Sequence, residues 1–374
     1  MTPPAYRLSP INATAAHAPG THFSSTQTCP PGTTRSYHVR HMPKSPALRR
    51  VQADPVPASS GPTDVRFFHG DNLPILHALL PTLRDQVTLV YLDPPFFTMR
   101  THARVERHAV PGGPPLRVLR PAFDDHWADF DAFLAMLRER LTVLRAVLAD
   151  HGSVVVHVDP KTSHYVKVMG DEIFGRNAFA SEIVWRYRRW PARTPNFQRV
   201  HDVLLRWVKN PDAEPRFVQQ YEELAPSTLK TWGKGKQQAV FDENGRRRRS
   251  STETTCSPGA PLGDVWEIPI VAPVARERTG YPTQKPEALL ERLIRACTLE
   301  GDLVLDPFAG SGTTLAVAGR LGRHAIGIDQ SAEAAGVIRQ RLAASGLQVH
   351  HATLVNGQLQ AHPEQGMGLR AKVS

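Results

Sequence analysis

The strongest constraint on the fold is a repeated pattern of short apolar runs that each end at an aspartate. The runs VTLVYL, SVVVHV and LVL are followed by Asp93, Asp159 and Asp306. Apolar residues at helical spacing lie between them, most clearly Phe130, Phe133, Leu134, Leu137, Leu141, Leu144 and Leu148, before Gly152 stops the pattern. Buried strands that alternate with amphipathic helices pair in parallel through right-handed crossovers. The sequence therefore predicts an α/β fold with a doubly wound, mostly parallel sheet.

Composition divides the chain into five parts. Residues 1–60 are rich in Pro, Ser, Thr and His and are predicted to form a disordered tail, because they lack the apolar content that would offset ordering entropy. The strand and helix pattern occupies residues 61–209 and returns in residues 281–356. Residues 210–280 are polar and lack that pattern, which indicates a functional insertion. Residues 357–374 are predicted to be a flexible C-terminal tail.

Charge and cysteine content narrow the class of protein. The formal net charge is +10, which favours a polyanionic partner. Three dispersed cysteines predict neither a disulfide framework nor a zinc site, and a reducing cytoplasm fits them best. No apolar run approaches the roughly 18 residues that span a bilayer, so no membrane partner is expected. His126, His157 and His164 lack metal-ligand spacing; structural roles and no metal are predicted.

The segment LVYLDPPFFT indicates a rigid acceptor site at the end of a strand. Pro94 and Pro95 remove two backbone donors and fix two φ angles, so the strand has to end at Asp93. A carboxylate, a bare carbonyl and the ring of Phe96 are thereby held together.

The segment LVLDPFAGSGTTL predicts a strand, a glycine turn and a helix. Gly310 and Gly312 would let a ligand approach the backbone closely at the helix N-terminus. A glycine pair alone is also compatible with NAD. Asp306 before the turn disfavours a phosphate there and favours a cationic group, and Asp329, which ends the next strand, stands where an acid takes ribose hydroxyls. These acids favour an adenosyl amino acid as the ligand.

Four ordered motifs carry a family resemblance. LDPPF at 92–96, YPTQKP at 281–286, LDPFAGSGTT at 305–314 and GID at 327–329 resemble the motif set of amino-group DNA methyltransferases that use S-adenosylmethionine. The order, with the catalytic motif first and the cofactor motif last, is similar to that of the permuted β group. The resemblance covers roughly residues 64–209 and 281–345.

The resemblance implies a mechanism and a set of site residues. Asp93 and the Pro94 carbonyl would accept the two hydrogens of an exocyclic amino group, Pro95 would keep these acceptors rigid, and Phe96 would stack on a base flipped from the duplex. The implied S-adenosyl-L-methionine site consists of Asp306, Phe308, Gly310, Ser311, Gly312, Thr313, Asp329, Thr283, Gln284 and Lys285, with Asp71 as a further candidate.

Basic residues are candidates for contact with double-stranded DNA. Arg188 and Arg189 lie in WRYRRWPAR, where Trp185 and Tyr187 have either a nucleic-acid or a core role; Arg246, Arg247, Arg248 and Arg249 lie within the predicted target-recognition insertion. The resemblance also implies a cognate restriction endonuclease as a candidate partner, and a monomer or homodimer. Two other readings keep the fold: a methyltransferase acting on RNA or a protein amide, and a catalytically silent DNA-binding module.

The sequence favours one target base but leaves an alternative open. Methylation at carbon 5 of cytosine is disfavoured because it needs a nucleophilic cysteine, usually after proline, and the chain has no Pro-Cys pair. In the family that the motifs resemble, an acid at the position of Asp93 usually accompanies N6 of adenine, and serine is commoner for N4 of cytosine. Adenine is therefore the favoured target, with cytosine N4 as the alternative.

Overall fold

The computed structural model describes residues 63–108, 110, 113–114, 116–191, 193, 195–232, 240–248, 257–355 and 358–361. The predicted tail at residues 1–60 lies outside these residues. No described helix has both the length and the apolar character needed to cross a membrane.

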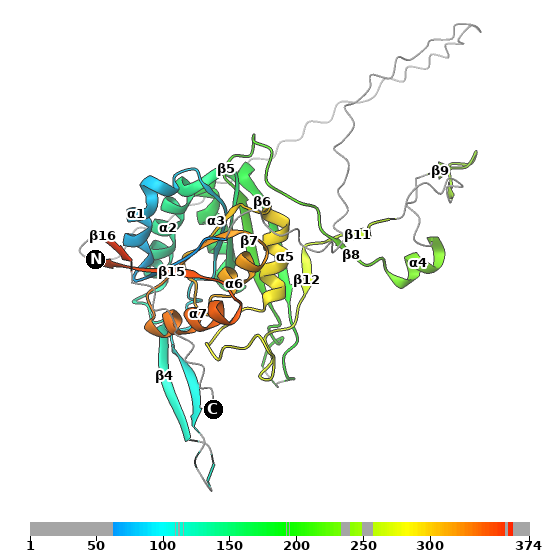
Figure 1. Cartoon of the computed structure of the whole chain (residues 1–374). Coiled ribbons are helices and arrows are strands. Elements are labelled where there is room, and N and C mark those ends of the chain that lie inside the picture. The colour runs from blue at the N-terminus through cyan, green and yellow to red at the C-terminus, as the bar shows by residue number, and fades with distance from the viewer. Residues whose placement is uncertain are drawn as a thin grey trace, which may run out of the picture. The chain divides into compact units, whose positions relative to one another are not determined.

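A single sheet forms the centre of the described chain (Figure 1), with the strand order β12-β6-β7-β5-β2-β13-β14-β1-β15-β16. Its strands are β1 (Val65–His69), β2 (Val87–Leu92), β5 (Leu148–Val158), β6 (Phe179–Arg186), β7 (His201–Val208), β12 (Val265–Glu267), β13 (Leu303–Asp306), β14 (His324–Asp329), β15 (Val349–Val355) and β16 (Gln358–Ala361). The six strands from β5 to β15 in this order pair in parallel. β7 pairs antiparallel with β5 and β6, and β16 pairs antiparallel with β15. This confirms the predicted doubly wound, mostly parallel α/β fold.

Helices cover both faces of the sheet (Figure 1). The helices α1 (Asn72–Leu83), α2 (Phe130–Val147) and α3 (Ser163–Phe174) pack on one face, and α5 (Glu287–Cys297), α6 (Thr313–Arg320) and α7 (Ala332–Ala344) pack on the other. In β2, Leu89 and Tyr91 face the second group of helices, whereas Val90 and Leu92 face the first. A strand buried on both faces needs apolar residues throughout, which is why its sequence does not alternate.

The boundary between α2 and β5 differs from the predicted one. The side chain of Asp129 caps α2 by accepting a hydrogen bond from the Ala132 amide at 2.7 Å. The helix ends at Val147, five residues before Gly152, because Leu148 already pairs with Val87 of β2. The end of the predicted helical stripe therefore belongs to the sheet.

The remaining elements are short or lie apart from the central sheet. The strands β3 (Thr101–His108) and β4 (Leu116–Asp124) form a separate two-stranded ribbon, and η1 (Arg176–Ala178) precedes β6. The predicted insertion at 210–280 contains β8 (Tyr221–Glu222), α4 (Pro226–Trp232), β9 (Val240–Phe241), β10 (Arg247–Arg248) and β11 (Ala260–Pro261). It also contains β12, which extends the central sheet beside β6, and residues 358–361 of the predicted C-terminal tail form β16 against β15.

A glycine in α3 gives a test of this packing. A Cβ atom at Gly170 would lie 2.3 Å from Trp207 Cζ2, and Trp207 is fully buried. We expect Gly170→Ala to lower the free energy of unfolding by about 1–3 kcal/mol, because overpacking outweighs the better helix propensity of alanine. Urea denaturation measures the change. Gly336→Ala in α7 is the matched control, since no atom lies within 4 Å of its added Cβ, and it should stabilise the protein by about 0.5–1 kcal/mol. An unchanged unfolding midpoint for Gly170→Ala would contradict the packing described.

Candidate active site

A pocket opens at the carboxyl ends of three parallel strands. Asp93 follows β2, Asp306 ends β13 and Asp329 ends β14, and all three line the same pocket. In an open parallel sheet this edge is where ligands bind. Although the sequence separates Asp93 from Asp306 by more than two hundred positions, the sheet brings them together.

The two oxygens of Asp93 have different surroundings. Oδ2 accepts a hydrogen bond from the Nζ atom of Lys285, whose ammonium group also lies 5.1 Å from the centre of the Phe96 ring. Oδ1 is buried and 3.6 Å from Nδ1 of His157, with no hydrogen-bond partner among the described residues. Oδ2 is thus the oxygen that already accepts from a nitrogen donor, and that donor belongs to another segment of the pocket lining.

A buried polar chain supports Asp93 from behind. His157 is fully buried, and its Nδ1 lies 2.9 Å from the hydroxyl of Tyr91. Its Nε2 lies 3.4 Å from Oδ2 of Asp202, whose Oδ1 accepts a hydrogen bond from the Tyr187 hydroxyl at 3.0 Å. Burial raises the pKa of Asp202, but hydrogen bonds and charge from His157, with the charge of Lys285, outweigh burial and leave that pKa below its usual value. His157, for which the sequence predicts a structural role, therefore contacts the back of the site.

The loop after Pro95 is strained and held by one buried carboxylate. Phe97 and Met99 have φ angles of 56° and 55°, in the left-handed region that costs non-glycine residues energy. Asp125 is fully buried and accepts hydrogen bonds from the Phe97 amide at 3.2 Å, and from the Thr98 amide at 2.7 Å and hydroxyl at 2.6 Å. These contacts fix the loop beside Asp93.

Asp306 is a buried carboxylate without a cationic partner among the described residues. Its side chain is buried and Oδ1 accepts a hydrogen bond from the Phe308 amide at 3.0 Å. Burial raises the pKa of Asp306 to about 7, reinforced by the charges of Asp93 and Asp329 and opposed by hydrogen bonds from Thr314 and Phe308. A cation that entered the pocket would relieve this cost.

Asp329 is held by the glycine turn. Its Oδ2 accepts a hydrogen bond from the Gly310 amide and its Oδ1 from the Ser331 amide, both at 2.8 Å. Burial raises the pKa of Asp329, and these two amide donors oppose the rise. The carboxylate therefore ties the end of β14 to the turn that follows β13.

The glycine turn has the geometry that its residues predict. Gly310 and Gly312 have φ angles of 49° and 72°, and a Cβ atom on Gly312 would lie 2.8 Å from Cγ1 of Ile338. Thr313 opens α6, and its hydroxyl donates to the carbonyl of Lys285 at 3.2 Å. Ser311 is buried, and Phe308, Gly310, Ser311 and Thr313 line the pocket, whereas Gly312 packs against α7 and is not part of the lining.

The segment 281–286 closes one side of the pocket. Thr283 has a φ of 58°, and Thr283, Gln284 and Lys285 all line the pocket. The amide of Gln284 is used within the segment, where its Oε1 accepts a hydrogen bond from the Thr279 amide at 2.8 Å. Of the three side chains, that of Lys285 contacts Asp93.

Asp71, the further candidate for the cofactor site, lines the pocket and has a structural role there. Its Oδ1 caps α1 by accepting a hydrogen bond from the Leu73 amide at 3.0 Å, and it lies 3.0 Å from a guanidinium nitrogen of Arg140. Asn72 beside it donates to the Pro307 carbonyl at 2.7 Å. These contacts connect α1 to the glycine turn.

None of the predicted DNA-contacting arginines whose side chains are described lines the pocket. Arg188 and Arg189 are exposed after the end of β6, and Arg189 packs over the ring of Tyr187 with 5.2 Å between its Cζ atom and the ring centre. Trp185 and Tyr187 are buried, so their core role is the correct one. Arg246 is exposed, the side chains of Arg247 and Arg248 in β10 are not described, and Arg249 lies outside the described residues.

Several residues in or behind the pocket are not singled out by the sequence. Tyr91 occupies one more apolar position of a strand, Asp125 sits in a segment without a motif, and Asp202, behind the pocket, is not marked by any spacing. Tyr281 belongs to a quoted motif, yet its role shows only in the structure, where its buried ring lines the pocket against Gly310. Contacts between distant segments create these roles, and sequence spacing does not report them.

Comparisons with known proteins agree with the motifs. A family model described as DNA methylase, N6_N4_Mtase, matches residues 87–340. Type II methyltransferase M.HpaI of Haemophilus parainfluenzae is 31% identical over 214 residues, which are 57% of this chain and 60% of the relative. Type II methyltransferase M.EcaI of Enterobacter cloacae is 29% identical over 343 residues, with 79% of this chain and 73% of the relative covered. The chain thus spans less than two thirds of the length of M.HpaI.

Among solved structures, that of the M1.HpyAVI–SAM complex superposes with a TM-score of 0.45. It is 20% identical in sequence, and the match covers 74% of this chain and 98% of the other.

The raised pKa of Asp306 predicts how stability depends on pH. Between pH 4 and about 7 the folded protein holds a proton on Asp306 that the unfolded chain has released, so the stability from this group falls as pH rises. The stability of the wild type relative to Asp306→Asn should therefore fall by about 2–3 kcal/mol between pH 5 and pH 7. Urea denaturation at each pH measures the difference.

Asp124→Asn is the control for this measurement. Asp124 is exposed, and hydrogen bonds from His126 and Thr101 lower its pKa. It is therefore ionised in both the folded and the unfolded chain between pH 5 and pH 7, and its contribution should stay constant over that range. A flat difference for Asp306→Asn would show that burial does not raise that pKa.

Proposed function

Because the chain belongs to the N6 and N4 DNA methylase family, we propose that it transfers a methyl group from S-adenosyl-L-methionine to an exocyclic amino group of duplex DNA. The observation that carries the proposal is the shared pocket, which is lined by Asp93 and Pro94 and also by the buried Asp306, whose carboxylate has no cationic partner among the described residues. One side of the pocket offers acceptors for an amino group. The other offers an anion for an ammonium group.

The pocket fits the cofactor on chemical grounds. Asp306 would hold the ammonium group of its methionine part, because that carboxylate is buried without a cationic partner among the described residues. Asp329 would accept from the ribose hydroxyls, and Gly310, which lines the pocket without a side chain, would let the cofactor approach the backbone closely. When bound, the cofactor supplies an electrophilic methyl group on a sulfonium.

Asp93 and Pro94 would make the amino nitrogen a better nucleophile. The lone pair of an exocyclic amino group is delocalised into the ring, and two acceptors on its hydrogens localise that pair on the nitrogen. Oδ2 of Asp93 already accepts from Lys285 Nζ, which marks the direction from which an N–H donor reaches it. Stabilisation by fixed acceptors is electrostatic catalysis, and no covalent intermediate is needed.

Phe96 would stack on the base after it leaves the duplex, as chemistry on a base edge requires. The ring is fixed by an edge contact to His157, with 5.5 Å between ring centres. Arg188, Arg189 and Arg246 are proposed to contact phosphates. The relatives are named type II methyltransferases, so the proposal extends to a restriction endonuclease as the cognate partner.

We propose N6 of adenine as the target, on the ground that Asp93 supplies the acid that usually accompanies adenine in the family. The test is mass spectrometry of nucleosides from DNA treated with the protein and labelled cofactor. N6-methyladenine supports the proposal, N4-methylcytosine overturns the choice of base, and no label in any DNA overturns the function.

Removal of the Asp93 carboxylate should separate binding from chemistry. We expect Asp93→Ala to lower the single-turnover rate of methyl transfer at least about 10²-fold, since it removes an acceptor used mainly in the transition state. Cofactor affinity, measured by calorimetry, should change less than about twofold. The control is Asp150→Ala, which removes an exposed carboxylate near the N-terminal end of β5, at the edge of the sheet away from the pocket. It should leave the rate of methyl transfer and the cofactor affinity unchanged. Near-normal turnover in Asp93→Ala would refute the assigned role.

Asp329 should affect binding of the cofactor, whereas Asp93 should affect the rate of methyl transfer. We expect Asp329→Ala to weaken binding of S-adenosyl-L-methionine on the order of tenfold, because hydrogen bonds to a charged group are lost. The loss should be smaller for a 2′-deoxyribose analogue of the cofactor, measured by the same calorimetry. An equal loss for both ligands would mean that Asp329 only shapes the turn through Gly310 and Ser331.

A further inference from the structure

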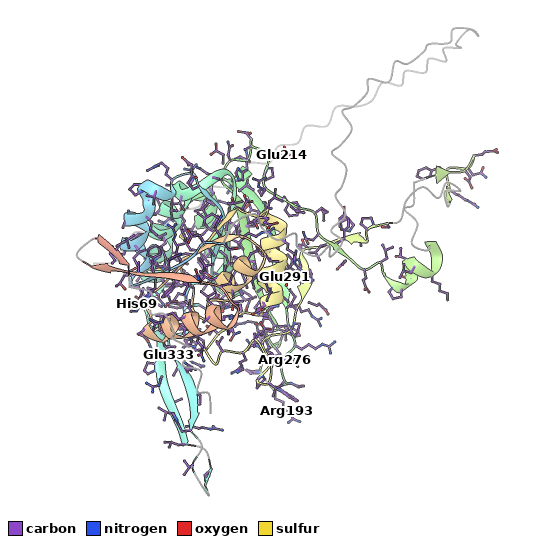
Figure 2. All side chains as sticks on the ribbon, viewed as in Figure 1. His69, Arg193, Glu214, Arg276, Glu291 and Glu333 are labelled. Atoms are coloured by element: carbon purple, nitrogen blue, oxygen red, sulfur yellow. The ribbon has the colours of Figure 1, made fainter. Side chains whose placement is uncertain are left out.

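The ribbon formed by β3 and β4 has no role in the mechanism above. It joins the protein directly after the loop of Asp93, and residues at its root, including His102 and Phe123, line the pocket. The rings of these two residues stack with 4.6 Å between their centres. On the other side of the root, Arg104 forms an ion pair with Glu333 of α7, which Figure 2 labels beside the ribbon. The ribbon is therefore anchored at the mouth of the candidate active site.

The charge of the ribbon is one-sided. Residues 100–120 contain five arginines and one acidic residue. The register places the Arg104 position opposite Arg120 and the Arg107 position opposite Arg117, so basic positions are paired across the two strands. Arg117 and Arg120 are exposed in β4. A polyanion is the kind of partner that such a basic, exposed strand fits.

The ribbon also exposes apolar side chains. Val105 and Leu119 are directly opposite each other and are 47% and 67% exposed. They share a face with the Arg107 and Arg117 positions, because residues two apart in a strand point to the same side. An isolated two-stranded ribbon is marginally stable, and one with exposed apolar residues gains from a partner.

We propose that the β3–β4 ribbon is a DNA-binding arm, whose arginines contact phosphates of the duplex that flanks the target base. A two-stranded ribbon has the width of the DNA major groove, and its anchored end lies where the flipped base enters the pocket. A second copy of this chain is a poorer partner, because it carries the same basic ribbon and a net charge of +10. The proposal rests on the proposed function and adds an interaction surface to it.

The test compares Arg117→Ala and Arg117→Glu with the wild type. The probe is a fluorescein-labelled 40-base-pair duplex of random sequence, because phosphate contacts do not depend on sequence. Anisotropy titrations over a range of KCl concentrations give the affinity and its salt dependence. Arg117→Ala should weaken binding on the order of fivefold and reduce the salt slope by about one, and Arg117→Glu should weaken it further.

Two controls keep the result specific. Arg145→Ala removes an exposed arginine near the C-terminal end of α2, at the opposite edge of the sheet from the pocket, and should leave DNA affinity unchanged. Cofactor affinity should be the same in all variants, because Arg117 does not line the pocket. Methyl transfer to genomic DNA should show a raised KM for DNA with kcat unchanged in Arg117→Ala.

The outcomes separate this proposal from the proposed function. If the wild type transfers methyl groups to DNA and Arg117→Glu binds the duplex with unchanged affinity and salt slope, the arm is refuted and the function stands. If the wild type transfers no methyl group to any DNA, the function itself fails. Sedimentation in which Leu119→Asp abolishes a dimer without changing DNA affinity would assign the ribbon to a second copy and also overturn the proposal.

Discussion

The parallel pairing of β13 with β2 is the contact on which the candidate site depends. Val304 lies beside Leu89 and Leu305 beside Val90, so Asp306 is carried to the same edge of the sheet as Asp93. β14 pairs with the other side of β13 and adds Asp329 to that edge. These strands are buried on both faces by helices, and the site is therefore positioned by the buried sheet rather than by loops alone.

The carboxylates of Asp93, Asp306 and Asp329 lie at one edge of the sheet and repel one another, and their negative charges are compensated to different degrees. Lys285 compensates Asp93, and two backbone amides compensate Asp329. Asp306 receives hydrogen bonds but no ion pair among the described residues, and burial raises its pKa to about 7. A buried charge without a partner is costly, and proteins keep such groups mainly where a ligand supplies the partner. The imbalance distinguishes a ligand site from an ordinary network of ion pairs.

Local chemistry explains which features the sequence could predict. The buried strands, the glycine turn and the break at Pro94 are each determined by neighbouring residues, so they follow from residue type and order. The end of α2 differs from the predicted one because the pairing of Leu148 with Val87 is a tertiary contact, which local sequence does not contain. His157 and Asp202 meet only after β5 and β7 pair, and no spacing in the chain announces it. The sequence does not predict the ribbon for the same reason, since the pairing of Arg104 with Arg120 exists only in register.

Asp125 joins the proposed arm to the proposed acceptor. Its carboxylate holds Phe97 and Thr98 in the loop after Pro95, and its backbone accepts from the Met99 amide at 3.0 Å and donates to the Arg100 carbonyl at 3.1 Å, where β3 begins. The loop next to Asp93 and the root of the ribbon are therefore fixed by one buried residue. Strain at two non-glycine positions persists in such a loop only when its surroundings determine the backbone. The same carboxylate and backbone groups of Asp125 thus connect the root of the ribbon with the backbone beside Asp93.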